Sequence, residues 1–158
     1  MVSAVDLREM ADSIHLDYEA QQRLGKRLAS IILTEVYNIP GHATPIELDA
    51  VYCSGDTIRI QFKGVNGKLT APGDPLGFSL KFSVQVSKGA EETVLPTITS
   101  VAFDPDQPNT VIIKCSKALK PEWKPMLYYA SGLNPECNVV DEKDIPVPAF
   151  GPISLDVK

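Results

Sequence analysis

The chain has 158 residues, enough for one domain with its own core or for a helix plus a smaller β domain. Its formal net charge of −5 argues against a nucleic-acid-binding surface, since no basic stripe with interleaved aromatic residues is present. The absence of a run of about 18 apolar residues predicts no transmembrane helix. The acidic residues after Met1 do not fit a secretory signal, but in a piece of a longer protein that would be uninformative.

The first 16 residues combine a short lead-in with two residues that could carry chemistry. Residues 1–11 predict a short helix or a loose connection. Asp12 and His15 follow, with two residues between them. In a tight loop, this spacing lets the carboxylate accept the Nδ1 proton of the histidine, which leaves Nε2 free to take a proton from a nucleophile. The alternative is that Asp12 is a loop or capping residue and His15 a surface or packed histidine, because such pairs also occur by chance.

An amphipathic helix is predicted over about residues 17–38, with Asp17 as its N-cap and Pro40-Gly41 after its end. Apolar residues recur at three- and four-residue steps on one side, at Leu24, Leu28, Ile31, Ile32 and Val36. Polar residues, Arg27 among them, take the other positions. His15 would lie just before the positive end of the helix, which favours the neutral imidazole that a general base requires.

From Pro45 onward the pattern changes to β structure. Alternating apolar and polar residues, separated by turn residues, predict strands at 46–52, 57–62, 78–86, 97–103, 110–115 and 126–130. Ser54-Gly55-Asp56 predicts the turn of a hairpin between the first two. This many short strands indicate an antiparallel β-sandwich, so the predicted fold class is α+β with the helix first. The proline-rich tail over 138–152 is expected to run along the surface.

The cysteines and histidines predict neither a disulfide framework nor a metal site. Cys53, Cys115 and Cys137 form no Cys-x-x-Cys pair, which excludes a zinc ribbon or a thioredoxin-like motif. At most one intrachain disulfide could form, and free buried thiols are expected. His15 and His42 are not spaced as an i, i+4 metal-binding pair.

Two groups of residues in the β portion have alternative interpretations. Four aromatic residues could form a sugar-binding platform, although packing in the core is favoured: Trp123, Tyr128, Tyr129 and Phe150. Asp104, Asp106 and Asn109 could form a loose Ca²⁺ loop, but the glycine and terminal glutamate of an EF-hand are missing, so turn chemistry is favoured.

Short sequence runs at both ends of the chain occur in a characteristic order. The N-terminal runs are Asp12-Ser-Ile-His15, Arg23-Leu-Gly-Lys-Arg27-Leu-Ala29 and Val36-Tyr37. The C-terminal runs are Leu127-Tyr-Tyr-Ala-Ser-Gly132, Asn134-Pro135, Asn138-Val-Val-Asp141 and Ile145-Pro-Val-Pro-Ala-Phe150. Together they resemble the closing blocks of SGNH-type hydrolases, specifically the sialate O-acetylesterase-like carbohydrate esterases. In that family an Asp-x-x-His-Pro loop precedes a helix carrying Gly-Arg-Arg-Leu-Ala.

The chain departs from the family pattern in two ways. Leu16 stands where the family has proline, which would leave the orientation of His15 less restricted. The serine nucleophile block, Gly-Asp-Ser or Gly-Gln-Ser-Asn, and the blocks with the oxyanion-hole glycine and asparagine have no match. Ser54-Gly55-Asp56 has the letters in another order and lies after His15, so it is interpreted as a hairpin turn.

The resemblance implies a division of the chain and roles for two residues. Residues 1–40 would be the last catalytic loop and C-terminal helix of an α/β SGNH domain, and 41–158 a β-sandwich accessory domain. His15 would be the general base that activates the serine, and Asp12 the residue that orients His15. The reaction would pass through a covalent acyl-enzyme and need no cofactor or metal.

The resemblance also implies partners. The serine would come from the remaining N-terminal part of the esterase, as a second chain or as part of the same precursor, and the substrate would be an acetylated carbohydrate. The chain would then be inactive by itself. The compartment stays undetermined, and a secreted or extracytoplasmic location agrees with the family. Two alternatives remain open: a non-catalytic β-sandwich module that binds carbohydrate or protein, and a structural domain that packs on a catalytic neighbour.

Overall fold

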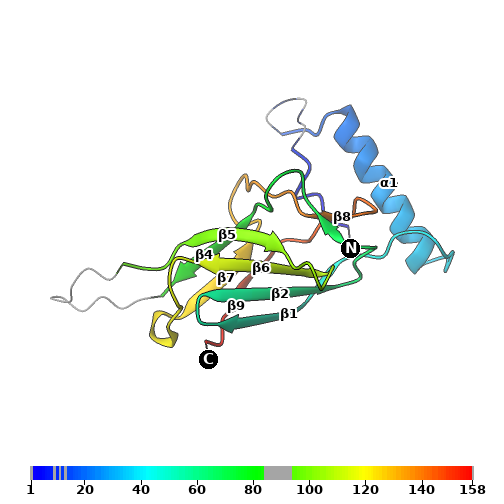
Figure 1. The fold of residues 1–158 in the computed structure, drawn as a ribbon. Coiled ribbons are helices and arrows are strands. Elements are labelled where there is room, and N and C mark those ends of the chain that lie inside the picture. The colour runs from blue at the N-terminus through cyan, green and yellow to red at the C-terminus, as the bar shows by residue number, and fades with distance from the viewer. Residues whose placement is uncertain (1, 9, 11, 13, 84–93, 158) are drawn as a thin grey trace.

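The structure of the chain, a computed structural model, describes residues 2–8, 10, 12, 14–83 and 94–157. Within these residues one α-helix precedes a set of antiparallel strands (Figure 1). The elements are α1 (Tyr18–Glu35), β1 (Glu47–Ser54), β2 (Thr57–Lys63), β3 (Leu69–Thr70), β4 (Phe78–Phe82), β5 (Ile98–Phe103), β6 (Thr110–Cys115), the 3-10 helix η1 (Pro121–Trp123), β7 (Pro125–Tyr129), β8 (Val140–Asp141) and β9 (Phe150–Ser154). The predicted α+β class, with the helix first and antiparallel sheets after it, is confirmed.

Helix α1 begins and ends close to the predicted positions. Asp17 is the N-cap, and its Oδ1 accepts a hydrogen bond of 2.9 Å from the backbone N–H of Ala20. At the other end, Asn38 has a φ of 54°, a left-handed conformation that cannot continue the helix. Figure 1 shows α1 at one end of the molecule, beyond β8 and away from the larger sheets. None of the described helices is long and apolar enough to cross a membrane.

The strands form a four-stranded sheet in the order β1-β2-β6-β5, a three-stranded sheet in the order β4-β7-β9, and a two-stranded sheet of β3 and β8. The predicted hairpin is confirmed, because Ser54 of β1 pairs with Thr57 of β2 around Gly55, whose φ is 59°. Residues from the two larger sheets share one apolar core, in which the Phe62 and Phe150 rings lie 6.2 Å apart. Strand β4 ends at Phe82, and the last residues predicted for it, 84–86, lie outside the described residues.

The middle of the C-terminal tail is buried, which contradicts a surface path for the whole of 138–152, although Glu142, Lys143 and the residues from Ala149 to Pro152 other than Phe150 are exposed. Val139 and Val147 are fully enclosed, and they join each other through a backbone hydrogen bond of 3.0 Å from Val147 N–H to Val139 O. Pro152 is tolerated because it lies in β9, an edge strand of its sheet, where a residue need not donate to a neighbour on both sides. Residues 1–11 were predicted to form either a short helix or a loose connection. The residues described there form an irregular connection with a turn at Val5-Asp6.

Candidate functional site

The Asp12 carboxylate and the His15 imidazole are in direct contact. Asp12 Oδ2 lies 2.8 Å from His15 Nδ1, and Asp12 Oδ1 accepts hydrogen bonds of 2.8 Å from the backbone N–H groups of Ile14 and His15. One carboxylate therefore closes the loop and holds the imidazole at the same time. The structure brings the two predicted residues together in the expected geometry, while their catalytic roles stay a prediction.

The base of this loop is held by its flanking residues. Met10 and Leu16 form an antiparallel bridge on either side of it, and α1 begins two residues later. Leu16 stands where the carbohydrate esterases that the sequence resembles have proline. Its backbone oxygen accepts a hydrogen bond of 2.7 Å from Gln21 Nε2. That bond and the Asp17 cap give the entry into α1 a defined geometry without a proline.

The hydrogen bonds of Asp12 set its charge state. The bond to the His15 side chain, followed by those from the backbone N–H groups of Ile14 and His15, lowers the pKa of Asp12 below its ordinary value. Asp12 is therefore an acceptor at neutral pH. A neutral imidazole that donates from Nδ1 to this carboxylate has Nε2 as its proton acceptor.

Both side chains are open to solvent, which distinguishes this pair from a complete active site. The His15 side chain is 67% exposed and that of Asp12 is 53% exposed. Among the residues that the structure describes, no serine hydroxyl is hydrogen-bonded to His15. The chain therefore presents a carboxylate and an oriented imidazole to whatever lies next to the loop.

The apolar side of α1 is largely uncovered. Of the five residues in the predicted stripe, Ile31 is buried, but Leu28, Ile32 and Val36 are exposed. Ile14 before α1, Tyr18 at its first position and Tyr37 beyond its end are exposed as well. A large apolar patch on a protein surface is typical of an interaction site. We call the exposed side chains of Ile14, Tyr18, Leu28, Ile32, Val36 and Tyr37 the α1 face.

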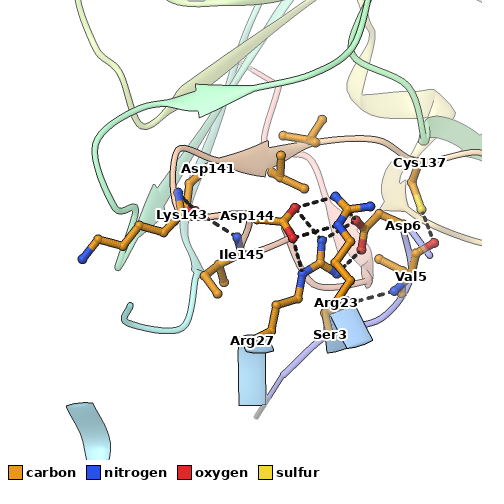
Figure 2. Close-up of polar contacts among 12 residues, drawn as sticks. Ser3, Val5, Asp6, Arg23, Arg27, Cys137, Asp141, Lys143, Asp144 and Ile145 are labelled. Carbon is orange, nitrogen blue, oxygen red and sulfur yellow. Dashed lines mark hydrogen bonds and ion pairs between the residues drawn. The ribbon is translucent and has the colours of Figure 1, made fainter. Parts of the chain in front are cut away.

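The sequence pattern missed an ionic cluster, which we define as Asp6, Arg23, Arg27 and Asp144 (Figure 2). The helical pattern assigned Arg27 to the polar side, yet only 2% of its side chain is exposed. Its guanidinium donates to Asp6 on one side and to Asp144 on the other. The available signal was the i, i+4 spacing of two arginines, but nothing local pointed to a partner 117 positions away.

The other predicted groups behave as structural residues. Trp123 and Tyr129 are buried, and the Tyr129 and Phe150 rings stack with their centroids 5.7 Å apart, which confirms the core interpretation for these three residues, whereas Tyr128 is only half-buried. Asp104 is buried, pairs with Arg59 and accepts a hydrogen bond from the backbone N–H of Asp106, in agreement with turn chemistry. The described residues contain no group of three or more side chains able to hold a metal ion.

The cysteine prediction is confirmed for all three residues. Cys53, Cys115 and Cys137 are free and buried. Burial raises the pKa of each thiol, and for Cys115, where the nearby Cys53 and Asp56 add to the effect, to about 11. The thiols are therefore protonated at neutral pH and are not nucleophiles in the folded chain.

Comparison with known proteins gives a structural match. No protein-family model matches the sequence, and no curated protein is significantly similar to it. The chain is similar to a solved structure described as a novel carbohydrate acetylesterase from Xanthomonas citri, with a TM-score of 0.63 and 16% sequence identity. The match covers 92% of this chain and 30% of the esterase chain. The chain therefore has a fold that resembles part of a carbohydrate acetylesterase.

Proposed function

We propose that the chain is the C-terminal part of a carbohydrate O-acetylesterase of the sialate type and supplies the histidine and aspartate of a Ser-His-Asp triad. The observation that carries the proposal is the 2.8 Å contact between Asp12 Oδ2 and His15 Nδ1. A fold that resembles part of a carbohydrate acetylesterase supports it.

In this reaction His15 moves the proton at each step. Nε2 accepts the proton of the serine hydroxyl as the serine oxygen attacks the acetyl carbonyl, and Asp12 stabilises the resulting imidazolium. The imidazolium then protonates the leaving sugar oxygen, which releases the carbohydrate and leaves an acetyl-serine. Nε2 next accepts a proton from water as the water attacks the acetyl group. When the serine leaves, it takes this proton back and acetate is released.

The serine and the oxyanion hole come, in this proposal, from an N-terminal part of the esterase, present as a second chain or in the same precursor. The α1 face supports such a partner, because exposed apolar side chains of this number are stabilised when another surface covers them. Ile14 lies within the Asp12–His15 loop and Tyr18 is the first residue of α1, so a domain that covers the face would also approach His15. The small share of the esterase chain covered by the match agrees with a part of a larger protein.

The test combines this chain with a polypeptide that is encoded beside it or in the same precursor and that carries a Gly-Asp-Ser or Gly-Gln-Ser-Asn block. We expect the two to copurify and to hydrolyse 4-nitrophenyl acetate, whereas each alone is inactive. His15→Ala should abolish the activity and Asp12→Ala should lower kcat by about 10²–10⁴. His42→Ala, which alters the other histidine, is the matched control and should leave the rate unchanged. If His15→Ala hydrolyses the ester at the wild-type rate, the proposal is wrong.

A further inference from the structure

Residues before and after the Asp12–His15 loop contact one stretch near the C-terminus, residues 136–144, which we call the anchor segment. On the N-terminal side of the loop, Cys137 Sγ donates a hydrogen bond of 2.8 Å to the backbone oxygen of Val5. Arg8 forms an ion pair of 3.3 Å with Glu136. The segment that leads into the loop therefore lies against the anchor segment at two points.

On the C-terminal side, α1 is attached to the same segment through Asp144. Arg23 Nε donates to Asp144 Oδ2 over 2.7 Å, and Arg27 Nη2 donates to Asp144 Oδ1 over 2.9 Å. Arg23 and Arg27 are one helical turn apart, so the carboxylate receives both guanidinium groups from the same side of α1 (Figure 2). The first half of α1 is thus fixed to the anchor segment.

The backbone of the anchor segment presents Asp144 in a defined geometry. Asp141 is buried, and its Oδ1 accepts hydrogen bonds of 2.9 Å from Lys143 N–H and 3.0 Å from Ile145 N–H. Asp144 lies in the turn between them, with a φ of 61° that aspartate and asparagine tolerate better than most residues. The turn holds its shape independently of the arginines, so an Asp144→Asn substitution changes the charge with little effect on the backbone.

The two sides of the loop are also joined to each other. Arg27 Nη1 and Nη2 donate to Asp6 Oδ1 and Oδ2 over 2.8 and 2.7 Å. Both side chains are almost completely enclosed, Arg27 at 2% and Asp6 at 3% exposure. The ionic cluster contains two positive and two negative groups. If one of its buried side chains were removed, the charge of its buried partner would no longer be neutralised.

We infer that the anchor segment positions the candidate catalytic loop, and that Asp144 is a positioning residue that acts through Arg23 and Arg27. The effect of Asp144 on catalysis, though not its effect on the loop, rests on the proposed function. The bonds of Asp12 orient His15 within the loop, but the placement of the loop relative to a serine on another domain depends on its two ends. A misplacement of about 1 Å can lower a rate by about 10².

The experiment compares amide hydrogen exchange by NMR in the full 158-residue chain and its Asp144→Asn variant. The reporters are the Ile14 and His15 amides, which donate to Asp12 Oδ1. We expect their exchange to accelerate by about tenfold in the variant, while the amides of Ile58 and Ile60 in β2 stay protected. Glu142→Gln removes an exposed carboxylate from the same segment and should change none of these rates.

The outcomes separate positioning from general stability. Unchanged Ile14 and His15 exchange in a folded Asp144→Asn variant overturns the inference, and so does an acceleration of the same size in β2. If Asp144→Asn does not fold, Arg23→Lys, which alters a half-buried member of the cluster, provides the same comparison. In the active complex, Asp144→Asn should lower kcat about tenfold with KM unchanged, and Asp144→Glu should recover part of the loss. The exchange result needs no esterase activity, so it stands or falls separately from the proposed function.

Discussion

Arg27 of α1 and Asp6 of the N-terminal segment form a buried bidentate ion pair, with Nη1 2.8 Å from Oδ1 and Nη2 2.7 Å from Oδ2. Burial by itself would lower the pKa of Arg27, but the hydrogen bonds and charges of Asp6 and Asp144 outweigh it and raise the pKa above its ordinary value. The guanidinium is therefore always charged and depends on its two carboxylates for compensation.

Arg27→Met should destabilise the chain strongly, because it leaves the buried Asp6 carboxylate without its bidentate partner. We expect a loss of about 3–5 kcal/mol in the free energy of unfolding, measured by urea denaturation followed by circular dichroism. Lys26→Met, at the adjacent exposed position of α1, is the control and should have little effect. Equal stability of the two variants would show that the buried pair contributes nothing measurable.

Ile31 and Ile32 are neighbours in α1 with opposite environments, since Ile31 packs in the core and Ile32 belongs to the α1 face. Ile31→Ala should cost about 2–5 kcal/mol, because it leaves a cavity in a packed site. Ile32→Ala in the isolated chain should stay within about 0.5 kcal/mol. With the serine-bearing partner present, Ile32→Asp should weaken copurification, and unaltered binding would argue that the α1 face is not the contact surface.

Acid should weaken the ionic cluster. Burial raises the pKa of Asp144, but its hydrogen bonds with Arg23 and Arg27 outweigh that effect, and the net pKa is lowered. A carboxylate with a lowered pKa in the folded state contributes stability above its unfolded pKa of about 3.9 and loses that contribution as the pH falls through the folded value.

The thermal midpoints of the wild-type chain and Asp144→Asn should therefore differ most near pH 6 and converge only as the pH falls below the lowered pKa of Asp144, where the wild-type carboxyl becomes neutral. Differential scanning calorimetry at several pH values checks this. A constant difference over the whole range would mean that the charge of Asp144 does not stabilise the fold.

The thiols should be unreactive until the chain unfolds. Cys53, Cys115 and Cys137 are buried, and the Cys115 pKa of about 11 leaves almost no thiolate at neutral pH. We expect an aromatic disulfide reagent to label none of them in the native chain and all three in concentrated urea. Rapid labelling of one thiol in the native state would indicate that its surroundings open locally.

Features that depend on near neighbours in the chain could be predicted from the sequence. The Asp17 cap and the β1-β2 hairpin involve contacts over a few residues, and both are present in the structure. The Asp12–His15 contact is of the same kind, since three residues separate the pair and the loop geometry follows from the Asp12 side chain.

The sequence by itself predicted α1, six of the strands and the candidate pair, because hydrophobic period, capping and turn chemistry act over short distances. Strands β3, β8 and β9, which pair with distant parts of the chain, were not predicted. Only the tertiary structure decided that Arg27 is buried and that part of the proline-rich tail, including Val139 and Val147, lies in the core. The partner of Arg27 lies 117 positions away, and the edge position of β9 exists only once the sheet is assembled. A helical hydrophobic pattern assigns every arginine to the exposed side of the helix. It cannot show that a carboxylate far away in the sequence neutralises the charge of a buried arginine.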